Sequence, residues 1–139
     1  MNNQLFHQFL EGQDTLCVLE GNDKIFTSQR EALIPLLEYI DNFSHLHPQV
    51  TILDKTVGNA AALLAIKADA IKVYSPLGSQ LAADTLSRYN REYRFTETVP
   101  FIRSLDGRDM CPMEKLSLSE DMSPDRFYKA VRRYYEKDN

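Results

Sequence analysis

The segment from Val57 to Ala68 limits the possible folds most, because it is apolar on almost every side. On a helix, one side would carry Val57, Ala60, Ala61, Leu64 and Ala65, and the other Ala62, Leu63 and Ile66. A helix with this pattern has to be covered on most sides by other elements. Apolar segments flank it, Val50–Leu53 before and Ala70–Tyr74 after, and both are typical of buried strands. The three segments together predict a β-α-β unit.

A second β-α-β unit follows along the chain. The segment from Gln80 to Tyr89 predicts a helix, and Glu92–Thr96 alternates polar and apolar residues as an edge strand does. Right-handed crossovers make the three strands parallel. Before them, Thr15–Glu20 and Lys24–Thr27 predict a hairpin around a Gly-Asn-Asp turn. We therefore expect an α/β fold with a mixed five-stranded sheet and helices on both faces.

Four further segments carry local signals. The first dozen residues predict a short amphipathic helix that ends at Gly12. Ser28-Gln29-Arg30-Glu31 has the spacing of a capping box and predicts a helix to about Asn42, with a kink or a late start at Pro35. Ser75–Ser79 predicts a turn. Ser123-Pro124 predicts a final helix over about 123–137, with Phe127, Val131 and Tyr134 docked on the sheet.

Length and charge exclude several classes of protein. With 139 residues and 43% apolar residues, the chain predicts one folded domain over 1–139 rather than a disordered segment. The net charge of −4 argues against a nucleic-acid partner, although the final helix combines basic and aromatic residues. No apolar run approaches the roughly 18 residues of a membrane span, and no signal peptide is visible. Two cysteines without a C-x-x-C motif favour a reducing compartment, so we expect a cytoplasmic protein, with homo-oligomers left open.

Polar residues follow the first two parallel strands, at the sheet edge where ligands bind in open α/β folds. We take these as candidate ligand-binding residues: Asp54, Lys55, Thr56, Gly58 and Asn59 after the first strand, and Ser75 and Ser79 after the second. The start of the apolar helix would favour an anion there. A structural alternative is that Thr56 caps this helix, Gly58 permits close packing and Asp54 complements the helix dipole.

Cys111 begins the second informative segment. Pro112 at a first helical turn places Cys111 at or near the N-cap, where the helix dipole and Lys115 would stabilise a thiolate. Cys111 is therefore a candidate nucleophile, with Asp54 or Glu114 as candidate proton carrier. The alternative is that Cys111 is a packing residue, as we expect for Cys17. The long connection from Val99 to Met110 can bring Cys111 into one pocket with Asp54.

Metal ligands are sparse. His45 and His47 form an H-x-H pair in a predicted loop, with no third ligand evident. A solvated loop is the simpler interpretation, so we expect no metal and no cofactor.

Two motifs resemble one known family. Residues 54–62 match its D-K-x-V-G-x-A-A-A segment, and residues 111–116 match its C-P-M-E-K-L segment. The family is a functionally uncharacterised group of small bacterial and archaeal proteins with a cytidine-deaminase-like fold. The resemblance covers about Thr15 to Leu118 and leaves out the final helix from Ser123. It implies a three-layer α/β/α core with strand order 2-1-3-4-5.

The resemblance does not extend to deaminase chemistry. Zinc deaminases carry H-x-E or C-x-E at the first of two helix starts and P-C-x-x-C at the second. The corresponding segments here, 28–31 and 54–59, contain no histidine or cysteine. We therefore expect a zinc-independent protein.

Two functions of different class follow from these residues. In the first, the chain binds a small anionic or nucleoside-like ligand without turnover. In the second, it is a cysteine-dependent enzyme with Cys111 as nucleophile. A histidine beside the thiol is missing, which leaves the acid–base set incomplete and favours binding. A purely structural or interaction role is the third alternative.

Overall fold

The computed structural model describes residues 3–137 and is built on one five-stranded sheet. Strands β3, β4 and β5 are parallel, and β1 is antiparallel to both β2 and β3. The order β2-β1-β3-β4-β5 confirms the predicted mixed sheet. The strands are β1 (Leu16–Glu20), β2 (Asp23–Ser28), β3 (Val50–Asp54), β4 (Ala70–Ser79) and β5 (Glu92–Val99).

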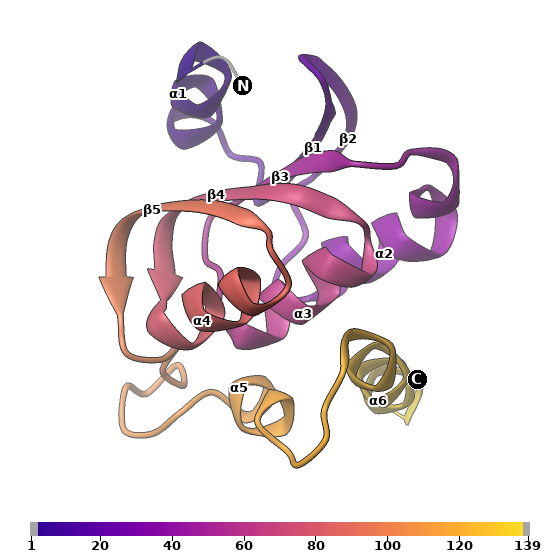
Figure 1. The fold of residues 1–139 in the computed structure, drawn as a ribbon. Coiled ribbons are helices and arrows are strands. Elements are labelled where there is room, and N and C mark those ends of the chain that lie inside the picture. Colours follow the sequence, from indigo (N-terminus) through magenta and orange to yellow (C-terminus); the bar gives the residue numbers. More distant parts are fainter. Residues whose placement is uncertain (1–2, 138–139) are drawn as a thin grey trace.

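Helices lie on both sides of the sheet, as predicted (Figure 1). Helix α1 (Asn3–Glu11) covers one face. The opposite face carries α2 (Ile34–Asn42), α3 (Asn59–Lys67) and α4 (Gln80–Arg88), with a 3-10 turn, η1 (Ser44–Leu46), after α2. Two further helices, α5 (Pro112–Ser117) and α6 (Pro124–Lys137), pack on the outer side of α3. No helix within residues 3–137 is both long and apolar enough to cross a membrane.

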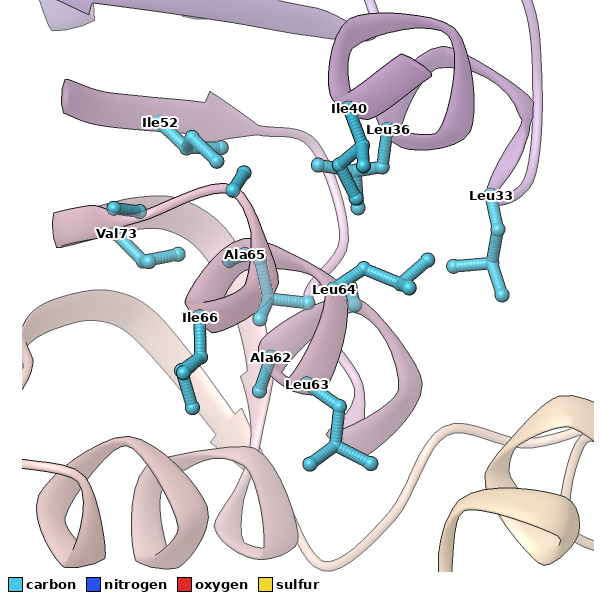
Figure 2. Close-up of a cluster of buried hydrophobic side chains, with 14 of the residues drawn as sticks. Leu33, Leu36, Ile40, Ile52, Ala62, Leu63, Leu64, Ala65, Ile66 and Val73 are labelled. Atoms are coloured by element: carbon cyan, nitrogen blue, oxygen red, sulfur yellow. The ribbon is translucent and has the colours of Figure 1, made fainter. Parts of the chain in front are cut away.

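The main core surrounds α3, which explains why its sequence is apolar on every side. All of its residues from Asn59 to Ile66 are buried. In Figure 2, Leu64 lies near Leu36 and Ile40 of α2 and Leu33 just before it. Ala65 lies toward the strand residues Ile52 and Val73. The alanines of α3 let the sheet and its neighbouring helices approach closely, and this apolar burial is the main source of the fold's stability.

A second, smaller cluster fills the space between α1 and the sheet. Phe9 of α1 packs there with four sheet residues, namely Cys17, Leu19, Leu53 and Tyr74. Cys17 is 1% exposed, which confirms its prediction as a core residue. Burial also raises the pKa of its thiol to about 11, so Cys17 stays protonated and unreactive near neutral pH.

Helix α2 begins later than the capping-box prediction placed it. Ser28 belongs to β2, and its hydroxyl accepts the backbone N–H of Arg30 in a local turn rather than capping a helix. The helix starts at Ile34 with Pro35 in its first turn, which was the late-start alternative. Ala32, between β2 and α2, has a φ of 59°, which lies in the left-handed region. The chain changes direction at this residue, and α2 begins two residues later.

Strand β4 continues through the segment predicted as a turn. Pro76 cannot donate a ladder hydrogen bond, yet β5 stays beside β4 as far as the pair Ser79–Val99. On the other side, the backbone of Val57 forms a bridge to Gly78, so Val57 lies outside α3. A Cβ on Gly78 would come within 2.1 Å of the Phe95 ring. Because Gly78 has no side chain, the Phe95 ring can pack directly against the backbone there. A local turn pattern does not reveal this role.

The final helix docks on another helix rather than on the sheet. Phe127 and Val131 are fully buried against α3, and Lys67 of α3 forms an ion pair with Asp125. Tyr134 is 47% exposed, so its predicted docking is wrong. The predicted cap of α6 is confirmed, because the Ser123 hydroxyl accepts the backbone N–H of Arg126 at 3.2 Å.

Candidate functional site

Six of the nine predicted site residues border a cavity of about 250 Å³, which we call the site cavity. It lies where the end of β3 and the start of α3 meet the segment before α2 and the segment around α5. Most of its lining is apolar. The lining residues are Thr15, Glu31, Ala32, Leu33, Asp54, Lys55, Thr56, Gly58, Ala60, Ala61, Ile102, Cys111, Met113 and Glu114.

Asp54 is the last residue of β3 and contributes the most reactive carboxyl of the site cavity. Burial raises the pKa of Asp54 to about 7, although the backbone N–H groups of Thr56 and Lys55 partly offset this effect. Among the described residues, no ion pair involves Asp54. A half-buried carboxyl with a pKa near 7 can both give and take a proton at neutral pH.

Glu114 serves a structural role that its sequence position did not indicate. Its side chain is 2% exposed, and its two oxygens accept the backbone N–H groups of Ala60 at 3.2 Å and Ile102 at 3.1 Å. The N-cap of α3, Gly58, has no side chain to accept a first-turn N–H, so Glu114 caps α3 from another helix by accepting the Ala60 N–H. Its other oxygen holds the Ile102 N–H of the loop before α5. The structural prediction that Thr56 caps α3 is wrong for the same reason. Both Glu114 oxygens thus accept a backbone N–H, which gives the residue a structural role.

Lys55 lies at the cavity but is engaged elsewhere. Its ammonium group donates to the carbonyl oxygen of Gly12 at 2.9 Å and lies 4.7 Å from the centre of the Phe9 ring. The lysine therefore holds the C-terminal end of α1 against the sheet. A bound anion would have to compete with these contacts.

Cys111 reaches the site cavity from the start of α5, as the loop-length argument predicts. It occupies the N-cap position, its thiol is free and partly exposed, and its backbone N–H donates to Ile102 at 2.9 Å. The structure thus brings Cys111 and Asp54 to one cavity although they lie far apart in sequence. Lys115 does not assist the thiol, because its ammonium group pairs with the Asp109 carboxylate at 2.5 Å.

Three predicted ligand-binding residues lie outside the site cavity. The Asn59 amide donates to Ser117 Oγ at 3.0 Å and accepts from the Thr85 hydroxyl, so it joins α3, α4 and α5 beside a separate hollow. The buried Ser75 hydroxyl bonds to the backbone of Leu77. The Ser79 hydroxyl accepts the Ala82 N–H at 3.0 Å as the N-cap of α4. All three side chains therefore have structural partners and do not line the site cavity.

Sequence reasoning missed the wall that precedes α2. Thr15, Glu31, Ala32 and Leu33 all line the cavity there, and Thr15 donates to the carbonyl oxygens of Ser28 and Arg30, which fixes this segment beside β1. Ile102 and Met113 were missed on the opposite wall. Met113 lies two positions after Cys111, which was the available signal for it. Ile102 lies nine positions before Cys111 and is brought beside it by the backbone hydrogen bond from the Cys111 N–H to its carbonyl oxygen, so no sequence signal marked it.

Within residues 3–137, no three histidine, cysteine, aspartate or glutamate side chains come together in a group that could hold a metal ion. His47 instead bonds to the Glu20 carboxylate at 2.9 Å, which ties the loop after η1 to the end of β1. This contact gives His47 a structural role.

Comparison with known proteins places the chain in a family. Residues 6–134 match the family model described as "Domain of unknown function (DUF1893)". The chain belongs to this family. The match includes residues 6–11 of α1 and most of α6, so the family extends further at both ends than the resemblance over Thr15–Leu118 implied.

A solved structure of the same family has a similar fold. The crystal structure of the DUF1893 family protein TM1506 from Thermotoga maritima is 27% identical in sequence and has a TM-score of 0.84. The match covers 95% of this chain and 88% of the other. No curated protein matches this chain. Membership in DUF1893 confirms the family resemblance and leaves the function to be argued from the site.

Proposed function

We propose that this chain binds a small, nucleoside-like molecule in the site cavity and does not turn it over. The observation that carries the proposal is one half-buried carboxyl without an ion-pair partner, Asp54, in an otherwise largely apolar cavity. Small-molecule sites typically combine an apolar lining with few polar groups that orient the ligand.

The size of the cavity limits the ligand. Its volume of about 250 Å³ is just below the roughly 300 Å³ at which sites for drug-sized molecules begin. A single ring system with a small substituent fits this space better than a dinucleotide does. A nucleoside would place its base inside and its sugar toward the open side.

The charges do not favour the anionic ligand considered from the sequence. Lys55 is the one cationic side chain among the described residues that line the cavity, and it is bonded to Gly12. Asp54 and Glu31 contribute carboxyl groups, and the Glu114 oxygens are directed to backbone N–H groups. An anion would meet more negative than positive groups, which is costly in a partly buried site.

Protection of Cys111 from alkylation tests this proposal directly. Cys111 lines the cavity and is partly exposed, whereas Cys17 is 1% exposed, so only Cys111 should react in the folded protein. Nucleosides at millimolar concentration should slow the reaction of Cys111 with iodoacetamide, followed by mass spectrometry. Free cysteine treated in parallel controls for effects on the reagent. Unchanged rates with every nucleoside would contradict the proposal.

A cysteine-dependent enzyme is the second candidate, because Cys111 and Asp54 line the same cavity. In that function, Cys111 would attack an electrophilic carbon and Asp54 would carry the proton. The pH dependence of alkylation separates the two functions. An activated thiol alkylates rapidly already near pH 6, whereas an ordinary cysteine needs a pH above about 8. Slow alkylation of Cys111 at pH 6 would rule out the cysteine-dependent enzyme function.

We also propose that the fold is related to that of the cytidine deaminases. The protein would act without zinc and would be located in the cytoplasm. The strand order β2-β1-β3-β4-β5 supports the relation. The absence of histidine and cysteine from segments 28–31 and 54–59 supports zinc independence. Two cysteines that are both free support a reducing compartment. Metal analysis of protein purified from cells tests the zinc proposal, and about one zinc per chain would contradict it.

A further inference from the structure

We infer that the group recognised by Asp54 is a small planar cation with an N–C–N edge, such as an amidine or a protonated amino-heterocycle. This inference rests on the proposed function, since it specifies the chemistry of a ligand in the same site cavity.

The first step concerns which polar groups of the cavity remain available to a ligand. The Glu114 oxygens accept the N–H groups of Ala60 and Ile102, and the Lys55 ammonium donates to Gly12. The Thr15 hydroxyl donates to backbone carbonyl oxygens of the segment before α2. Asp54 and Glu31 have no ion-pair partner among the described residues. The available charge is therefore negative.

The second step concerns the surroundings of Asp54. One of its oxygens faces the Thr56 backbone N–H at 3.4 Å, which is a long contact. The Lys55 backbone N–H, which donates to the Thr15 carbonyl oxygen, also favours the charged carboxyl. A carboxylate offers about four acceptor sites, so acceptor capacity remains for a ligand. The apolar part of the cavity lining includes Ala60, Ala61 and Leu33. A carboxyl in such a setting is stabilised in its charged form by a cation, and a planar N–C–N edge can donate to both oxygens at once.

The third step concerns shape. Mostly apolar walls with a carboxyl among them match a molecule that is apolar in its ring and charged at one edge. The cavity of about 250 Å³ holds one such ring. Met113 and Cys111 add polarizable sulfur atoms to the wall, and sulfur packs favourably against aromatic rings.

Three molecules of nearly equal shape test the inference: benzamidine (a cation), benzamide (neutral) and benzoate (an anion). Binding to the full-length chain is measured by NMR titration and by protection of Cys111 from alkylation. We expect benzamidine to bind at least about tenfold more tightly than benzamide, because a hydrogen-bonded charge pair outweighs a neutral contact. Benzoate should bind most weakly.

The variant Asp54→Asn should bring benzamidine and benzamide to within about twofold of each other. Asp84→Asn makes the same change at an exposed residue of α4 outside the site cavity. This variant should keep the wild-type preference for benzamidine over benzamide. If Asp54→Asn fails to fold, the wild-type pH profile replaces it. Benzamidine should then bind more tightly as pH rises from 5 to 7 and Asp54 ionises. The other titratable groups that line the cavity are Glu31, Lys55, Cys111 and Glu114.

The outcomes separate the two proposals. Equal or tighter binding of benzamide or benzoate, with protection of Cys111, would overturn the cation inference and leave a small-ligand cavity in place. Binding of benzamidine that survives Asp54→Asn unchanged, or that is independent of pH, would also overturn it. Failure of all three molecules and of every nucleoside to protect Cys111 would overturn both proposals.

Discussion

Gly58 and Glu114 fit each other so closely that a Cβ at position 58 would stand 2.7 Å from Glu114 Oε1. The residues lie at the start of α3 and within α5, and each explains the other. Gly58 leaves the first turn of α3 open, and the Glu114 carboxylate enters that space to accept the Ala60 N–H. This contact fastens the segment that carries Cys111 over the cavity bordered by Asp54.

Gly58→Ala should lower the free energy of unfolding by about 1–3 kcal/mol, because the added methyl group meets Glu114 and Ile102 in a packed site. Gly58 has φ −90°, so backbone strain contributes little. Urea denaturation measures the change. In the Glu114→Ala background, the same substitution should cost less, since part of the space is then vacant. An identical cost in both backgrounds would contradict the pairing.

Glu114→Gln should destabilise the protein by about 1–3 kcal/mol. A carboxylate accepts two N–H groups, whereas an amide accepts with one end only and leaves either the Ala60 or the Ile102 N–H unsatisfied. Urea denaturation again reports the loss, and hydrogen exchange should speed up at these two amides. Glu120→Gln, an exposed carboxylate, is the matched control. Equal stability of the two variants would rule out the capping role.

Asp54 should make stability decrease as pH rises from about 4 to about 7. Burial raises the pKa of Asp54 from 3.8 to about 7, so the folded protein binds this proton more tightly than the unfolded chain does. The resulting stabilisation is complete below about pH 3.8 and is lost as pH rises through about 7.

Asp54→Asn isolates that effect, because the amide does not titrate. Relative to wild type, the variant should gain stability between pH 4 and pH 7, and the difference should level off above pH 7. Denaturation midpoints at several pH values, together with a carboxyl NMR titration, measure it. Parallel curves for the two proteins would show that the pKa is not raised.

Ser79→Ala should reduce stability by about 1 kcal/mol and leave ligand binding unchanged. The Ser79 hydroxyl caps α4 by accepting the Ala82 N–H, and loss of such a cap typically costs this much. Ser87→Ala, at an exposed position of the same helix, should have little effect. Impaired protection of Cys111 by ligands in Ser79→Ala would return Ser79 to the binding site.

Much of the fold was determined by the sequence itself. The apolar helix between two apolar strands, followed by a second helix and an alternating strand, predicts a parallel β-α-β arrangement because side-chain periodicity is local. The hairpin turn and the Ser123 cap could also be predicted from the sequence, because each depends on a few adjacent residues. The same reasoning placed Asp54 and Cys111 at one cavity through the rule for strand ends.

Only the tertiary structure decided which polar residues are available to a ligand. Glu114 is bonded to a residue 54 positions away, and Asn59 to one 58 positions away. Capping signals also misled. Ser28 had the capping-box sequence, but α2 begins only at Ile34, after the chain passes Ala32 in the left-handed conformation. At α3, the distant Glu114 accepts the first-turn N–H of Ala60 in place of the predicted Thr56 cap. A hydrogen-bonding side chain takes whichever partner the packed helices bring within about 3 Å, and that choice is made by the packing of distant segments rather than by neighbouring residues.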